Sequence, residues 1–284
     1  MTTTETFQTV VYTSSPASEL ALDVFRPTAE SRHCAVLLFH GGGWRAGSKE
    51  AVHAQAAALA GSGFTALAVQ YRLLDAAAWP APLHDATAAL DWTRAHADDL
   101  GIDPGRVVMQ GHSAGGHIAL MTGTLDADRR PAAIAAYYPA IGFHRSDTPP
   151  APPQPGQLPN VAVDDLGRLP SWMLFGPGSA QDDLVAASPL DLVDAWFPPT
   201  IILHGAADRL YPFRSSISLH QRLTELGVST DLHLYADRDH AFERAPSMTA
   251  ATADAVRSFL QRTVTDKAEI DDEARRYPFP PGRP

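Results

Sequence analysis

The chain has 284 residues, a length typical of one large domain or of two small ones. Hydrophobic residues make up 45% and charged residues 19% of the chain, which indicates a globular protein and excludes a disordered or fibrous one. The formal net charge of −10 disfavours binding to nucleic acids and to anionic membranes, because both are negatively charged themselves.

Cysteine content and hydropathy exclude further classes of protein. Cys34 is the only cysteine, which excludes an internal disulfide and a cysteine-based zinc site, and we expect it to be a small core residue. No stretch approaches about 18 uninterrupted apolar residues, and the first residues do not resemble a secretory signal. We therefore expect a cytoplasmic protein that uses no metal or other cofactor and contacts no membrane.

The first 27 residues predict an antiparallel hairpin. Apolar side chains alternate around Val10–Tyr12 and again at Leu20, Leu22 and Val24. The turn-rich segment Ser14–Ser18 separates the two runs.

Beyond this hairpin, short apolar runs alternate with helical patterns. The runs lack strict alternation, which is typical of strands in a parallel sheet covered on both faces. They are Ala35–Phe39, Thr65–Val69, Arg106–Gln110, Ala132–Tyr138, Pro199–Leu203 and Thr230–Tyr235. Helices are predicted at residues 50–60, 83–100, 114–124, 213–226 and 247–263. This order predicts an α/β fold with a mostly parallel central sheet, an antiparallel N-terminal hairpin and helices on both faces.

The segment from His144 to Pro170 breaks this pattern, because it is rich in proline and has little periodicity. We predict an irregular, lid-like excursion at 144–187, or a plain surface insertion, inside a single domain of residues 1–284. Within it, Trp172, Met173 and Phe175 fit an apolar lid or a short buried helix, and we favour the helix. The tail at 264–284 is charged and then rich in proline, and we expect it to wrap the surface or to fray.

A serine at a predicted strand–helix corner is the first candidate for chemistry. It stands in the segment Gly111-His112-Ser113-Ala114-Gly115. A nucleophile on such a sharp turn needs glycines on both sides, where side chains would collide with neighbouring elements. The N-terminus of the following helix also favours a negative charge nearby. Ser113 is therefore the candidate nucleophile.

A serine hydroxyl needs a base to accept its proton, and that base needs a carboxylate to fix its tautomer. Functional groups of a parallel sheet follow the carboxyl ends of its strands. His240 follows the last predicted strand in this way, and Asp208 follows the strand before it. Asp237 and Asp239 are alternatives to Asp208, although their closeness to His240 in the chain is also typical of turn or capping residues.

Four other histidines are weaker candidates for the base. His40 and His204 end strands but precede glycine in tight turns, and we expect them to be structural. His112 and His117 flank Ser113, where a packed or exposed imidazole is the commoner role.

Three consecutive glycines follow the strand Ala35–Phe39, in His40-Gly41-Gly42-Gly43-Trp44. The sequence has neither of the two glycine patterns typical of phosphate-binding loops, G-x-G-x-x-G and G-x-x-x-x-G-K-[ST]. Such a run instead brings backbone N–H groups close to an oxygen that becomes negative during a reaction.

Together these motifs resemble those of α/β-hydrolase esterases, which use the chain order of Ser113, Asp208 and His240. The chain resembles bacterial carboxylesterases related to hormone-sensitive lipase. It is more similar to the group of feruloyl esterases, acetyl-xylan esterases and kynurenine formamidases, in which tryptophan follows the glycines. Two departures leave the subfamily open: Gln70 stands where an acid is common, and Ala241 where glycine is common.

The resemblance implies the role of each candidate residue. Ser113 would be the nucleophile, His240 the general base and acid, and Asp208 the carboxylate that orients the histidine. The implied oxyanion hole consists of the N–H groups of Gly42, Gly43 and Ala114. Substrate-binding side chains are expected beside these groups, at Trp44, His112 and Tyr211.

The expected reaction is hydrolysis of a small carboxylic ester through an acyl-enzyme on Ser113. Alternatives are amide hydrolysis of the arylformamidase kind, and lactone opening or acyl transfer in a biosynthetic pathway. A non-catalytic ligand receptor on the same fold is an alternative of a different class. The expected partner is a small ester or related acyl compound, and the sequence leaves a homodimer open.

Overall fold

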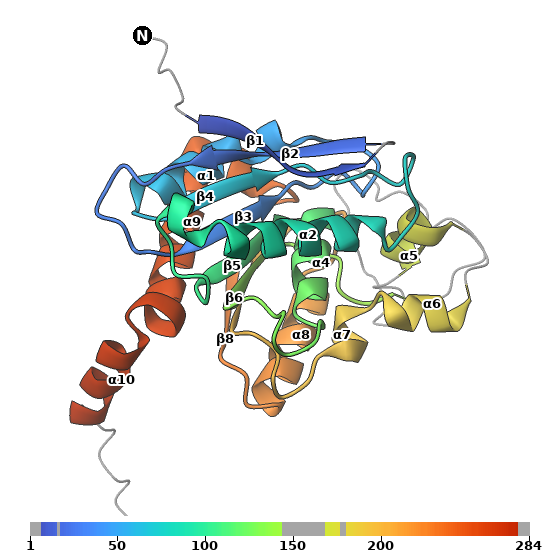
Figure 1. The fold of residues 1–284 in the computed structure, drawn as a ribbon. Helices are drawn as coiled ribbons and strands as arrows, with labels where there is room; N and C mark the ends of the chain where they lie inside the picture. The colour runs from blue at the N-terminus through green and yellow to red at the C-terminus, as the bar shows by residue number, and fades with distance from the viewer. Residues whose placement is uncertain (1–6, 16–17, 144–167, 177–179, 278–284) are drawn as a thin grey trace, which may run out of the picture.

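A computed structural model of the chain describes residues 7–15, 18–143, 168–176 and 180–277. It contains an eight-stranded sheet with the strand order β1-β2-β4-β3-β5-β6-β7-β8 (Figure 1). The strands are β1 (Phe7–Ser15), β2 (Ser18–Phe25), β3 (Ala35–Phe39), β4 (Thr65–Val69), β5 (Val107–His112), β6 (Ala133–Tyr137), β7 (Thr200–Gly205) and β8 (Thr230–Tyr235). β1 pairs antiparallel with β2, β2 pairs antiparallel with β4, and the remaining pairs are parallel. The predicted sheet is therefore confirmed.

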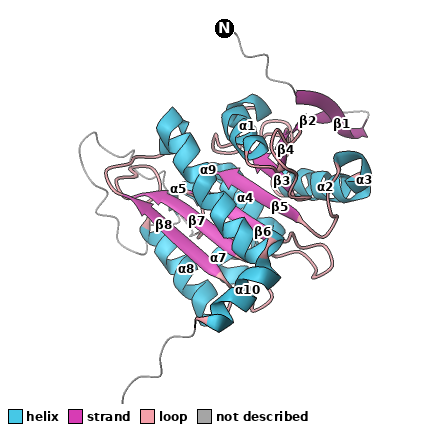
Figure 2. Cartoon of the chain, turned by 90° about the vertical axis from the view of Figure 1, so that its left-hand side faces the viewer, coloured by secondary structure: helices cyan, strands magenta, loops and turns pink. Residues whose placement is uncertain are grey.

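Helices cover both faces of this sheet, as predicted (Figure 2). They are α1 (His53–Gly61), α2 (Ala81–Ala95), α3 (Ala97–Leu100), α4 (Ala114–Thr122), α5 (Arg168–Phe175), α6 (Gln181–Ala186), α7 (Pro189–Leu192), α8 (Arg214–Glu225), α9 (Pro246–Leu260) and α10 (Lys267–Arg276). Two short 3-10 helices, η1 (Lys49–Val52) and η3 (Phe242–Arg244), lie in loops. α1 and α9 pack together on one face, and α2 and α4 on the other.

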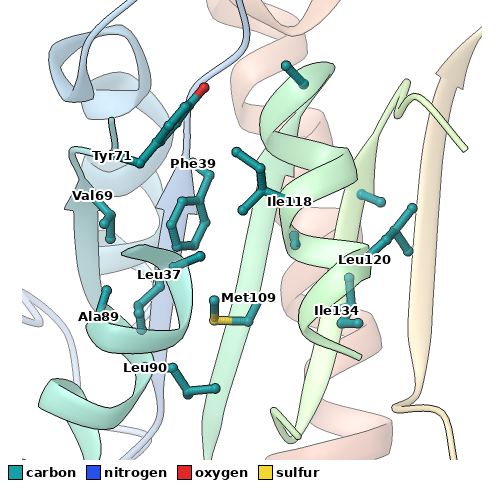
Figure 3. Packing of buried hydrophobic residues seen from close by; sticks show 14 of the residues in the cluster. Leu37, Phe39, Val69, Tyr71, Ala89, Leu90, Met109, Ile118, Leu120 and Ile134 are labelled. Atoms are coloured by element: carbon teal, nitrogen blue, oxygen red, sulfur yellow. The ribbon is translucent and has the colours of Figure 1, made fainter. Parts of the chain in front are cut away.

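Two apolar clusters fill the space between the sheet and its helices. The first cluster joins α2 and α4 to one face of the central strands through residues such as Leu37 and Met109 (Figure 3). The second cluster joins α1 and α9 to the opposite face through residues such as Val36 and Leu38. Because β3 to β7 are buried along their whole length, both faces need apolar residues, and the strands lack strict alternation.

The parallel strands bring distant segments of the chain to one edge of the sheet. β3 and β5 run in register next to each other, as do β7 and β8. The segment His40–Trp44, which we call the glycine loop, follows β3, and Ser113 follows β5. Asp208 follows β7, and His240 follows β8. Groups that are far apart in the sequence therefore meet beyond the carboxyl ends of the strands.

The two irregular regions predicted from the sequence contain helices in the structure. Residues 144–167 and 177–179 of the predicted excursion lie outside the described residues. Trp172, Met173 and Phe175 belong to helix α5, so the favoured helix is present, but their side chains are only partly buried. In the predicted tail, Lys267–Arg276 form helix α10, which was not predicted, and residues 278–284 lie outside the described residues. This helix projects away from the sheet and buries none of its residues (Figure 1). An ion pair between Lys267 and Asp271, one turn apart, supports this helix. No helix in the described ranges is long and apolar enough to cross a lipid bilayer.

Candidate active site

Ser113 lies at the sharp corner between β5 and α4. Its backbone has φ 55° and ψ −115°, a conformation that a residue with a side chain adopts only under constraint. The Ser113 N–H donates to Tyr137 O of β6 at 2.9 Å, and the Ser113 carbonyl accepts from His117 N–H of α4 at 3.0 Å. These bonds from both neighbours hold the serine at the N-terminus of the helix.

Gly111 and Gly115 allow this corner to form. A Cβ on Gly111 would collide with the carbonyl group of Gly115, and a Cβ on Gly115 would collide with the carbonyl group of Phe39. Both collisions are with backbone atoms, which no side-chain movement can relieve. The glycines are therefore required by the close approach of β3, β5 and α4.

His240 links Ser113 to Asp208. Its Nε2 lies 3.0 Å from Ser113 Oγ, and its Nδ1 lies 2.7 Å from Asp208 Oδ2. With the proton on Nδ1, the ring donates to the carboxylate and accepts from the serine hydroxyl, which is the tautomer of a general base. The structure thus brings together the three residues that the sequence singled out.

Asp208 is a buried carboxylate with its acceptor positions filled. Its side-chain Oδ1 accepts from the backbone N–H groups of Leu210 and Tyr211, both at 2.8 Å. Burial alone would raise the pKa of Asp208, but hydrogen bonds from His204 and His240 outweigh burial and hold this pKa well below its ordinary value of 3.8. Asp208 therefore stays charged and can stabilise a protonated His240.

His204 has a more specific place than the tight turn that was predicted for it. Its ring is completely buried, with Nδ1 2.7 Å from Ser216 Oγ. Its Nε2 lies 2.9 Å from Tyr211 O and 3.2 Å from Asp208 Oδ2. With Ser216 donating to Nδ1 and the proton on Nε2, the ring is locked and helps to hold Asp208. The spacing of four residues between His204 and Asp208 is the signal that could have indicated this contact.

The glycine loop lies against Ser113. A Cβ on Gly41 would lie 3.2 Å from Ser113 Cβ. Gly42 and Gly43 adopt φ angles of 125° and 60°, which favour glycine. Within the described ranges, the N–H groups of these two glycines donate to no other protein group, and Ala114 begins α4, where the first N–H groups of a helix have no intrahelical partner. All three donors are thus available to a bound oxygen.

A pocket of about 320 Å³ opens beside Ser113. His112 and Tyr211, two of the three predicted substrate-binding residues, line it together with the glycine loop. Met173 of α5 also lines the pocket; the sequence had offered it for an apolar lid or a short buried helix, but not among the substrate-binding residues.

Trp44, the third predicted substrate-binding residue, does not line this pocket. Its indole is completely buried in the first apolar cluster, where its ring centroid lies 5.3 Å from that of His117 and 6.3 Å from that of Phe143. The prediction is corrected accordingly: the Trp44 side chain is a core residue and is not exposed to the pocket. His112 is itself only 4% exposed, and burial lowers the pKa of its ring.

The alternative acids have other partners. Asp239 accepts from Arg209 Nε at 2.6 Å and from the backbone N–H of His240 at 2.8 Å. Asp237 is exposed in a turn with φ 58°. Neither carboxylate bonds to the His240 ring. In the part of the chain that the structure describes, no three His, Cys, Asp or Glu side chains are grouped as metal ligands.

Comparison with known proteins gives a family and several relatives. The pattern of the family described as alpha/beta hydrolase fold matches residues 36–244. The chain is 30% identical to "Probable carboxylic ester hydrolase LipM" of Mycobacterium tuberculosis, over 84% of this chain and 57% of that protein. It is 27% identical to esterase LipC of the same organism, over 93% of this chain and 67% of that protein. The chain thus spans little more than half the length of the first relative.

Solved structures of an esterase from Thermogutta terrifontis have a similar fold. The structure of this esterase phosphonylated by sarin has a TM-score of 0.75 and 25% identity, and the match covers 91% of this chain and 95% of that one. The butyrate-bound structure has a TM-score of 0.74 and 26% identity over the same shares of the two chains.

Proposed function

Because this chain belongs to the α/β-hydrolase fold family, we propose that it is a serine esterase that hydrolyses small carboxylic esters through an acyl-enzyme on Ser113. The observation that carries the proposal is the unbroken series of hydrogen bonds from Ser113 Oγ through His240 to Asp208, at the edge of a pocket. The names of the relatives and structural neighbours, which are carboxylic ester hydrolases and esterases, support the same reaction.

Acylation follows from the positions of the atoms. Ser113 Oγ attacks the ester carbonyl carbon while its proton moves to His240 Nε2. The carbonyl oxygen becomes an oxyanion, which the N–H groups of Gly42, Gly43 and Ala114 stabilise. The tetrahedral intermediate then loses its alkoxy group, which takes the proton from His240 and leaves as the alcohol.

Deacylation repeats these steps with water. His240 removes a proton from a water molecule, and the water oxygen attacks the acyl carbon on Ser113. The second tetrahedral intermediate expels Ser113 Oγ, which regains its proton from His240, and the carboxylic acid leaves. Asp208 stabilises the positively charged histidine in both halves of the reaction.

Hydrolysis of p-nitrophenyl butyrate, measured together with labelling by a fluorophosphonate, tests the proposal. We expect steady release of p-nitrophenol and one covalent label on the peptide that contains Ser113. A folded protein that neither hydrolyses the ester nor takes the label would overturn the proposal in favour of a non-catalytic receptor.

Two substrate comparisons separate the other reactions. Faster turnover of an aryl formamide than of an ester of similar size would assign the site to amide hydrolysis. Formation of a new ester from an added alcohol, in preference to the acid, would assign it to acyl transfer.

A further inference from the structure

Tyr211 contacts all three residues of the hydrogen-bonded series at the site. Its backbone N–H donates to Asp208 Oδ1 at 2.8 Å, and its carbonyl oxygen accepts from His204 Nε2 at 2.9 Å. Its ring packs edge-on against the ring of His240, with centroids 5.3 Å apart and planes at 85°. Its hydroxyl forms a hydrogen bond with Ser113 that acts on the pKa of the tyrosine. Tyr211 is only 2% exposed and lines the pocket, so its side chain has a defined position beside the serine.

The hydroxyl of Tyr211 donates to a weak acceptor. That acceptor is Met173 Sδ at 3.7 Å, and a thioether sulfur accepts hydrogen bonds only weakly. Burial raises the pKa of Tyr211 and the charge of Asp208 raises it further, although the hydrogen bond with Ser113 offsets part of this rise. The phenol therefore keeps its proton at neutral pH. A buried O–H group with a weak acceptor is ready to donate to a stronger acceptor, such as an ester oxygen.

Met173 separates this hydroxyl from the glycine loop. Its Cε methyl occupies the space above Gly43, since a Cβ on that glycine would collide with it, and its sulfur meets the Tyr211 hydroxyl. The hydroxyl therefore lies on the side of Ser113 where the His240 ring packs. An ester that acylates Ser113 turns its carbonyl oxygen toward the oxyanion donors and its alkoxy oxygen toward His240 Nε2, which protonates the leaving alcohol. The alkoxy oxygen is thus the substrate atom that comes within reach of Tyr211.

We propose that Tyr211 is a further catalytic residue, whose hydroxyl donates a hydrogen bond to the alkoxy oxygen of the ester during acylation of Ser113. This inference rests on the proposed esterase function. When the tetrahedral intermediate breaks down, the bond from the acyl carbon to the alkoxy oxygen breaks, its electron pair moves to that oxygen, and His240 supplies the proton. Tyr211 keeps its own proton and stabilises the negative charge that builds on the oxygen before this transfer is complete. The contribution of Tyr211 should therefore grow with the basicity of the leaving alcohol.

Butyrates of three alcohols test this role in the Tyr211→Phe variant. Phenylalanine retains the ring beside His240 and the backbone N–H that binds Asp208, so only the hydroxyl is lost. For ethyl butyrate, whose leaving group is strongly basic, kcat/KM should fall by about 10–100-fold, as expected for a lost hydrogen bond to a charged oxygen. For p-nitrophenyl butyrate, whose leaving group is stable as an anion, the loss should stay below about threefold. Phenyl butyrate, which matches the latter in shape, should give an intermediate loss.

Two control variants separate this role from a structural one. Met173→Leu removes the sulfur acceptor and keeps a side chain of similar size. The ratio of kcat/KM for phenyl butyrate to kcat/KM for p-nitrophenyl butyrate should therefore match that of the unmodified protein. Tyr235→Phe removes a partly buried phenol hydroxyl at the end of β8 that does not line the pocket, so it should also leave this ratio unchanged.

The outcomes also separate this inference from the proposed function. An equal loss of kcat/KM for phenyl and p-nitrophenyl butyrate in the Tyr211→Phe variant, or no loss for either, would overturn the role of Tyr211 at the alkoxy oxygen. A change of the same size in the Met173→Leu variant would overturn it too, because the hydroxyl would then act only through the methionine. Absence of all ester hydrolysis in the unmodified protein would instead overturn the proposed function.

Discussion

The proposed catalytic centre and the pocket wall formed by Met173 and Tyr211 meet at Gly43, but they are built in different ways. In the proposed catalytic centre, backbone geometry limits which residues fit: Ser113 is held at φ 55°, and there is no room for a side chain at Gly111. In the pocket wall the contact is made by side chains, because the Tyr211 hydroxyl donates a hydrogen bond to the Met173 sulfur. Backbone constraints permit few residue types and so leave a motif in the sequence, whereas an apolar contact can be made by many. The arrangement around Ser113 was therefore readable from the sequence, whereas the pocket wall at Met173 was not.

The largest effect is expected at Ser113, the proposed nucleophile. Ser113→Ala should lower kcat for p-nitrophenyl butyrate by more than about 10³-fold, because the acyl group then has no acceptor. The melting temperature should hardly change, since the serine backbone and not its hydroxyl makes the bonds that hold the corner. Turnover within tenfold of the unmodified protein would show that another residue attacks the ester.

The next largest effect is expected at Asp208, where two histidines meet. Asp208→Asn should lower kcat by about 10²–10⁴-fold, because the amide no longer fixes the tautomer of His240. Asp237→Asn is the matched control: this side chain is exposed, and asparagine tolerates its positive φ, so activity should stay within about twofold. The reverse pattern would identify Asp237 as the acid.

A smaller effect is expected at the junction of the two regions. Gly43→Ala should lower kcat by about 10–100-fold, since the new methyl group strikes Met173 and displaces an oxyanion donor. Combining it with Met173→Ala should recover part of this loss, because the collision is removed while the strain at φ 60° remains. If the double variant is no more active than Gly43→Ala alone, the two regions do not meet as described.

The smallest effect concerns the packing behind the catalytic centre. His117 donates to Ala187 O at 2.8 Å beside Trp44, and burial lowers the pKa of His117 from 6.5 to about 4. Between these two pH values the unfolded chain binds a proton that the folded chain does not. His117 should therefore lower the free energy of unfolding by about 1.4 kcal/mol for each pH unit of acidification in this range.

Denaturant unfolding between pH 7 and pH 4 measures that slope. The His117→Gln variant should be less stable at pH 7 but lose stability less steeply as the pH falls. Equal slopes in the two proteins would mean that the buried ring does not stay neutral in the folded state.

Sequence patterns predicted the parts of the molecule in which the structure permits few residue types. The strands β3 to β7 are buried on both faces, and their unalternated apolar runs showed this directly. Ser113 was recognisable from its flanking glycines, and Asp208 and His240 from their places after β7 and β8.

Features that depend on side-chain direction or on long-range packing could not be predicted. Trp44 ends the glycine loop in the sequence, but its indole lies in the core and not in the pocket. Met173 lines the pocket from α5, where Arg45, which is distant in the sequence, donates to its backbone carbonyl. Helix α10 buries nothing, so it has no apolar face that a periodicity could reveal.

Rapid-quench mass spectrometry during turnover of p-nitrophenyl butyrate tests the central claim most directly. The account predicts one butyryl group on the peptide that contains Ser113, which forms with the burst of p-nitrophenol and disappears as butyrate is released. A butyryl group on another residue, or a burst of p-nitrophenol with no acylated residue, would contradict it.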